Sequence, residues 1–116
     1  MRIALLTALL FATSLDVTAP ISSDTEGICV VEFNASFNSQ NSVSWIEELS
    51  DCKGKRIYIA EQPNMQIEHN IVVVPTIIVF NDGEEVERFQ ANIMMQMEAS
   101  QDEVQEAVDE IMLSWF

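Results

Sequence analysis

The chain has 116 residues, the usual length of one domain, and its 48% hydrophobic and 21% charged residues are typical of a globular protein rather than a disordered one. Five Lys and Arg residues against 19 Asp and Glu give a formal net charge of −14, which argues against nucleic acid as a partner. Two Cys and one His are too few for a disulfide-rich scaffold or a Cys/His zinc cluster, so we expect no metal and no cofactor.

Residues 1–14 have the order of a secretory signal peptide. Arg2 precedes an apolar run from Ile3 to Ala12, small residues end at Ser14, and the run is too short to cross a bilayer as a helix. Removal of this segment would leave an exported protein, periplasmic or secreted, with no membrane insertion. If the segment instead belongs to the domain, the protein is cytoplasmic. Residues 15–27 are polar and form a leader segment.

A run of β-branched and aromatic residues from Ile28 to Phe33 predicts the first strand, buried on both faces. Residues 34–41 are rich in Asn and Ser and predict a loop. Apolar residues then recur at helical spacing from Ser42 to Asp51, which predicts a helix. Gly54, which lies between two lysines, marks the predicted end of that helix.

Arg56 to Ala60 form the second predicted strand, and a proline begins a short predicted helix over residues 63–69. The apolar stretch 71–80 is interrupted by Pro75, which has no N–H to donate to a strand ladder. We therefore expect an approach segment before Pro75 and a third strand after it.

Asn81-Asp82-Gly83 predicts a tight hairpin turn, and Glu84 to Phe89 the strand that returns antiparallel. Ser100 and Glu103 form a capping box, and the apolar residues that follow at helical spacing, ending with Trp115, predict the last helix. This order of elements predicts an α/β fold with a central mixed sheet and helices on both faces.

Two segments resemble the thioredoxin family. The strand and loop VVEFNASF (Val30 to Phe37) resemble the thioredoxin segment that leads into the active site, and VVVPTIIVFNDGEEVERF (Val72 to Phe89) resembles its cis-proline, strand and hairpin. The resemblance implies a thioredoxin-like fold over residues 28–116. It also implies that Pro75 follows a cis peptide bond and that the backbone of Val74 can pair with an extended ligand.

The sequence departs from the family at the active-site loop. The positions of the thioredoxin Cys-x-x-Cys motif are occupied by Asn38, Ser39, Gln40 and Asn41. Disulfide exchange needs a thiolate that attacks and a second thiol that resolves the mixed disulfide, and these residues supply neither. The usual thioredoxin reaction is therefore excluded at this loop.

The remaining function of this degenerate active-site loop is expected to be binding. We expect a shallow groove between the loop and Val74–Pro75, with residues 92–97 at its rim, to take a peptide or protein segment. The amides of Asn38, Gln40 and Asn41 would serve as caps and hydrogen-bond partners there. The alternative is a relic site without a ligand. The protein is expected to be a monomer.

The two cysteines leave an enzymatic alternative open, in which Cys52 acts as the single thiol of a thiol-disulfide oxidoreductase or redox-homeostasis protein. Strand alternation places Cys29 on the face opposite the predicted helix that ends near Cys52, which disfavours a disulfide between them. Cys29 is then a small buried hydrophobe.

Two further signals lie in the acid of the first strand and in a methionine cluster. Glu32 takes the position of the buried acid of thioredoxins; burial would raise its pKa, whereas a place near the strand end would let it reach water.

Met94, Met95 and Met97 are soft ligands that suit Cu(I), but packing is the commoner use of such residues.

Overall fold

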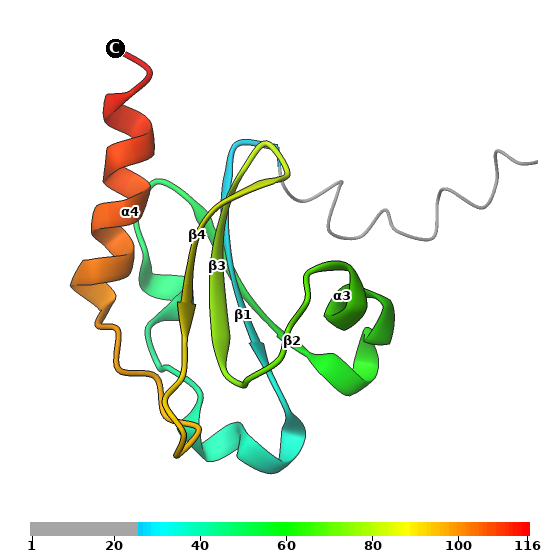
Figure 1. The fold of residues 1–116 in the computed structure, drawn as a ribbon. Helices are drawn as coiled ribbons and strands as arrows, with labels where there is room; N and C mark the ends of the chain where they lie inside the picture. Colours follow the sequence, from blue (N-terminus) through cyan, green and yellow to red (C-terminus); the bar gives the residue numbers. More distant parts are fainter. Residues whose placement is uncertain (1–25) are drawn as a thin grey trace, which may run out of the picture.

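The structure is a computed structural model that describes residues 26–116, so the predicted signal peptide lies outside the described residues. It contains one four-stranded sheet in the order β2-β1-β3-β4 (Figure 1). The strands are β1 (Ile28–Asn34), β2 (Lys53–Tyr58), β3 (Thr76–Asn81) and β4 (Glu84–Gln90). β1 pairs in parallel with β2 and antiparallel with β3, which in turn pairs antiparallel with β4. The sheet is therefore mixed, as the sequence predicts.

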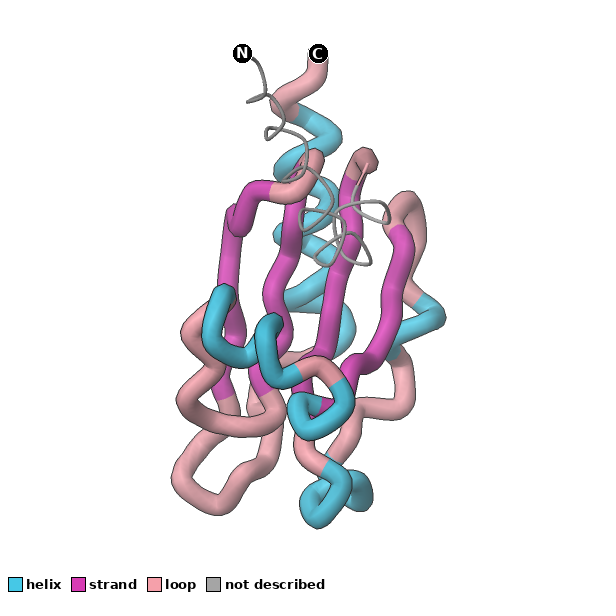
Figure 2. The backbone as a smooth tube through the Cα atoms, turned by 90° about the vertical axis from the view of Figure 1, so that its right-hand side faces the viewer, coloured by secondary structure: helices cyan, strands magenta, loops and turns pink. Residues whose placement is uncertain are grey.

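Helical segments cover both faces of the sheet (Figures 1 and 2). On one face, Phe33 and Val31 of β1 belong to the core cluster that contains Met65 of α3 (Pro63–Glu68). On the other face, Val30 packs in the cluster that contains Val108 of α4 (Gln101–Leu113). The predicted α/β architecture, a central mixed sheet with helices on both faces, is confirmed. None of the helices between residues 26 and 116 is long and apolar enough to cross a membrane.

The predicted hairpin and capping box are both present. The turn between β3 and β4 places Asp82 at φ 52° and Gly83 at φ 88°, the left-handed conformations that an Asp-Gly hairpin turn needs. At α4, the Ser100 hydroxyl accepts from the Glu103 N–H at 3.2 Å, and the Glu103 carboxylate accepts from the Ser100 N–H at 2.8 Å. Trp115 departs from the prediction, because it lies beyond the end of α4 and is 55% exposed.

The helix predicted from Ser42 to Asp51 is wrong. The chain forms two short 3-10 helices instead, η2 (Ser36–Asn41) and η3 (Ile46–Glu48), with extended backbone at Ser42 between them. The carboxylate of Glu32 accepts from the backbone N–H of Val43, and the Arg56 guanidinium donates to the backbone C=O of the same residue. Arg56 therefore occupies the C=O of Val43, which would accept a hydrogen bond from the first helical turn, and the local Ser residues favour turns over helix interiors.

The second strand also differs from its prediction, because β2 begins at Lys53 and ends at Tyr58, whereas residues 59–61 form the 3-10 helix η4 (Ile59–Glu61). Gly54 lies inside β2 rather than after a helix. A Cβ atom at Gly54 would come within 1.8 Å of the carbonyl oxygen of Ile46. Glycine is therefore required for the close approach of η3 to β2.

Candidate functional site

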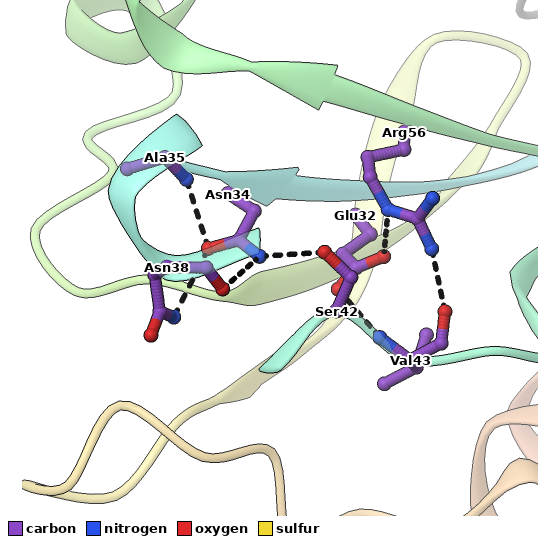
Figure 3. A network of polar contacts seen from close by, with 7 residues as sticks. All are labelled: Glu32, Asn34, Ala35, Asn38, Ser42, Val43 and Arg56. Atoms are coloured by element: carbon purple, nitrogen blue, oxygen red, sulfur yellow. Dashed lines mark hydrogen bonds and ion pairs between the residues drawn. The ribbon is translucent and has the colours of Figure 1, made fainter. Parts of the chain in front are cut away.

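The degenerate active-site loop begins at Asn34, a fully buried residue at the end of β1. Its Oδ1 accepts from the N–H of Ala35 at 2.8 Å, and its Nδ2 donates to the Ser42 hydroxyl at 2.9 Å and to the Asn38 carbonyl at 3.2 Å (Figure 3). One amide therefore joins the strand end to both ends of η2. The sequence alone does not predict these contacts of Asn34, although asparagines at positions 34, 38 and 41 recur three to four residues apart.

Asn38 is also buried, and its side chain is used within the protein. Its Nδ2 donates to Asn34 Oδ1 at 3.2 Å and to the backbone carbonyl of Met95 at 3.1 Å, while its Oδ1 accepts from Asn41 Nδ2 at 2.8 Å. The expectation that the Asn38 amide serves a peptide is therefore inconsistent with its contacts. Of the four residues at the Cys-x-x-Cys positions, Ser39 and Gln40 are the exposed ones.

Glu32 is fully buried on the face of Val30, and both of its carboxylate oxygens have partners. Oε1 forms an ion pair with Arg56 Nε at 2.8 Å, and Oε2 accepts from the Val43 N–H at 3.0 Å (Figure 3). Arg56 is about one quarter exposed, so this charge pair lies at the edge of the interior. Sequence reasoning predicts the face of Glu32 but not its partners, because Arg56 lies 24 residues further along the chain.

The second segment of the site contains Val74 and Pro75, both buried, joined by a cis peptide bond. The Pro75 carbonyl accepts from the N–H of Ala91 at 3.1 Å, and the Thr76 hydroxyl donates to the Val73 carbonyl at 2.7 Å. Within residues 26–116, the backbone N–H and C=O of Val74 make no hydrogen bond. This leaves one donor and one acceptor beside Pro75.

The third segment is the loop of residues 91–97 between β4 and α4. The Asn92 side-chain oxygen accepts from the N–H groups of Met94 at 2.8 Å and Gln96 at 3.1 Å, and Met95 adopts φ 60°. The contacts of this loop with Asn38 and Pro75 bring the three segments together. The result is an exposed apolar rim, with Phe37 71% exposed and Ile93 99% exposed.

The cysteines lie near the opposite end of the sheet. Lys53, next to Cys52, pairs with Cys29 at the start of β1, whereas the degenerate loop follows the end of that strand. Burial raises the pKa of the half-buried Cys52 thiol to about 11, and the nearby Cys29 thiol and the Asp51 and Asp109 carboxylates add to this effect. Cys52 is a free thiol, whereas Cys29 is fully buried.

No metal centre is formed by His, Cys, Asp and Glu in the described part of the chain, where no three such side chains gather. Met94 and Met95 are both exposed on the 91–97 loop, and Met97 packs partly against the core. The methionines therefore contribute to the apolar rim and to packing.

No protein-family model and no curated protein matches the sequence. Solved structures of thioredoxins do match: a mutant thioredoxin from Halobacterium salinarum at 21% identity, over 84% of this chain and 82% of that one, with a TM-score of 0.62. Thioredoxin from Schistosoma mansoni is 20% identical over 82% of this chain and 86% of its own, with a TM-score of 0.63. Thioredoxin from Fasciola hepatica is 16% identical over 84% of this chain and 92% of its own, with a TM-score of 0.57. The protein therefore has the thioredoxin fold.

Proposed function

We propose that the protein is a redox-inactive thioredoxin-like domain that binds an extended peptide or protein segment. The binding surface, here called the Val74 surface, consists of η2, Val74–Pro75 and the 91–97 loop. The unpaired backbone of Val74 carries the proposal, because a ligand strand can satisfy both of its groups. From residues 1–14 we further infer that the protein works after export, in the periplasm or outside the cell.

The absence of sulfur from the degenerate loop supports a binding role rather than electron transfer. Residues 38–41 contain no cysteine, so no mixed disulfide can form there. Cys52, the enzymatic alternative, has a pKa of about 11, so it is almost entirely protonated at neutral pH. A protonated thiol is a poor nucleophile, and its distance from Val74 separates it from the ligand surface.

The apolar rim supports a peptide or protein as the ligand. Phe37 and Ile93 are largely exposed although they are large and hydrophobic, and the exposed Met94 follows Ile93 in the sequence. The 91–97 loop that carries two of these residues is fixed by the Asn92 side chain and by the contact of Asn38 with Met95. A prearranged loop loses little conformational entropy when a ligand binds.

A library of short extended peptides, read by fluorescence anisotropy against the purified protein, tests the binding role. For the best peptide, Ile93→Ser and Phe37→Ser should each weaken binding about tenfold, since each removes a large apolar contact. Val86→Ser, at a half-exposed position on β4, is the matched control and should leave the affinity unchanged. N-methylation of the ligand backbone should weaken binding if main-chain pairing with Val74 occurs. An affinity insensitive to all these changes contradicts the proposal.

An insulin-reduction assay separates the binding protein from the oxidoreductase. The protein should show no turnover above the rate of the reductant alone. Turnover that disappears in Cys52→Ser would establish the single-thiol enzyme instead, and turnover that persists in that variant would implicate another thiol.

A further inference from the structure

A second surface lies at the other end of the sheet, where the chain before β2 passes beside α4 (Figure 1). Gln105 of α4 fixes this contact: its Oε1 accepts from the Ser50 N–H at 2.8 Å, and its Nε2 donates to the Ser50 carbonyl at 3.0 Å. The same Nε2 contacts Asp109 Oδ1 at 3.1 Å. This pair of reciprocal hydrogen bonds sets the position of Asp51 and Asp109 relative to each other.

A pocket of about 390 Å³ lies between these segments, lined by Asp51, Asp109, Met112, Leu113 and Phe116. Its lining supplies two carboxylates and no cation, together with three large apolar side chains. The apolar lining is open to solvent, because Leu113 is exposed and Phe116 is 97% exposed, and the exposed Trp115 lies between them in sequence. Carboxylates beside large apolar side chains are absent from the Val74 surface, where the exposed side chains are apolar or polar without charge.

We propose that this pocket, here called the α4 pocket, binds a protein segment in which an Arg or Lys lies next to a large apolar residue. The cation would approach Asp51 and Asp109, and the apolar side chain would contact Met112, Leu113 and Phe116. Charge complementarity selects this occupant, because an uncharged apolar segment leaves both carboxylates partly desolvated without a partner. The three large apolar side chains of the lining offer contacts that a small organic cation does not use, which favours a protein segment.

A second copy of the chain fits the pocket poorly. Self-association would bring Asp51 and Asp109 close to carboxylates of a molecule with the same net charge of −14, and like charges in an interface oppose binding. An anionic lipid surface is disfavoured for the same reason.

The α4 pocket and the Val74 surface are separate sites. Asp51 precedes the start of β2, which pairs with the start of β1, whereas η2 follows the end of β1. The length of this strand separates them by about 20 Å. One ligand segment can therefore occupy either site without contacting the other, and the two can be tested independently.

Fluorescence anisotropy with an acetylated, amidated peptide of core Arg-Leu-Phe-Arg, at an ionic strength of about 20 mM, tests the proposal. Two matched peptides replace either both Arg by Glu or both apolar residues by Ser. The parent peptide should bind at least ~10-fold more tightly than either analogue. Asp109→Asn should weaken binding about fivefold, and Phe116→Ser by a similar factor. Glu110→Gln, the same charge change on an exposed residue outside the pocket, should alter affinity less than about twofold.

Equal effects of Asp109→Asn and Glu110→Gln would reduce the interaction to general attraction by an acidic protein and overturn the proposal. Loss of binding in Ile93→Ser but not in Asp109→Asn would place the peptide on the Val74 surface, which removes this inference and leaves the proposed function intact. Equal binding of ethylguanidinium alone would identify a small-cation site instead. A dimer in sedimentation that Phe116→Ser converts to a monomer would assign the pocket to a second copy.

Discussion

The side chains of Asn34, at the end of β1, and Asn38, in η2, are both buried and hydrogen-bonded within the protein. Each buried amide has hydrogen-bond partners that offset its removal from water. Their loss would leave partners such as Asn41 Nδ2 and the Met95 carbonyl without a bond. The loop is therefore held in one conformation by polar contacts.

Asn38→Ala should lower the free energy of unfolding by about 1–3 kcal/mol, because it leaves buried polar partners unsatisfied. Urea denaturation followed by circular dichroism measures the change. Gln40→Ala is the matched control on the same 3-10 helix, and its exposed side chain predicts a change within about 0.5 kcal/mol. Equal effects of the two substitutions would show that the Asn38 contacts add no stability.

Cys52 should react slowly with iodoacetamide near neutral pH. A rise of its pKa from 9.0 to about 11 lowers the thiolate fraction about 100-fold at any pH well below 9. The rate should therefore increase about tenfold per pH unit up to about pH 10, as long as the protein remains folded. Mass spectrometry locates the label, with Cys52→Ser as the control. Rapid alkylation of Cys52 at pH 7 would show a much lower pKa.

At the residue scale, the sequence predicts the site only in part. It places Glu32 on the face of Val30, because strand alternation determines this feature. The loop predicted over residues 34–41 is wrong, since Asn34 ends β1 and Ser36–Asn41 form the 3-10 helix η2. The sequence does not predict that Asn38 points inward, nor that Arg56 binds Glu32. Those outcomes depend on residues that are remote in sequence and are brought together by folding.

The elements between β1 and β2 illustrate how tertiary contacts override local preference. The spacing of Val43, Ile46 and Leu49 favours a helix, and all three residues do face the core. Burial is therefore predicted correctly, whereas backbone conformation is not. Arg56 binds the C=O of Val43, and this contact competes with the hydrogen bond that the same C=O would accept in a helix. The first and third strands, the hairpin and the final helix are predicted because their signals are local.

Gly54→Ala tests the close approach of η3 to β2. The added methyl group would lie 1.8 Å from the Ile46 carbonyl oxygen, so the backbone must shift, at a cost of about 2–4 kcal/mol in the free energy of unfolding. Lys53→Ala, at an exposed position of the same strand, should change stability by less than about 0.5 kcal/mol. Chemical denaturation provides both values, and a neutral Gly54→Ala would mean that η3 can move away.

The whole molecule carries far more acids than bases, and few of them are neutralised by ion pairs. Within the described residues, Glu32 forms an ion pair with Arg56 and Glu85 forms one with Arg88. The hydrogen bond and charge of Arg88 lower the pKa of Glu85, but this pair lies at the surface, partly exposed, and adds little stability. Repulsion among the remaining carboxylates therefore opposes the folded state.

Salt should consequently stabilise the protein. An increase of ionic strength from about 0.02 to 0.5 M screens the repulsion, and the melting temperature should rise by several degrees. Differential scanning calorimetry in NaCl measures this rise, with KCl as a check against specific ion effects. A melting temperature that falls with salt would show that the two ion pairs outweigh the repulsion.

The burial of Asn34 has a consequence for the cell in which the protein is made. Asn34-Ala35-Ser36 is an acceptor tripeptide for N-linked oligosaccharides, and the sugar attaches to the side-chain nitrogen. In the folded domain that nitrogen is bonded to Ser42 and to the Asn38 carbonyl, with no room for a glycan. A chain glycosylated at Asn34 before it folds could not reach this conformation, so a eukaryotic secretory host would yield the native domain only from unmodified chains.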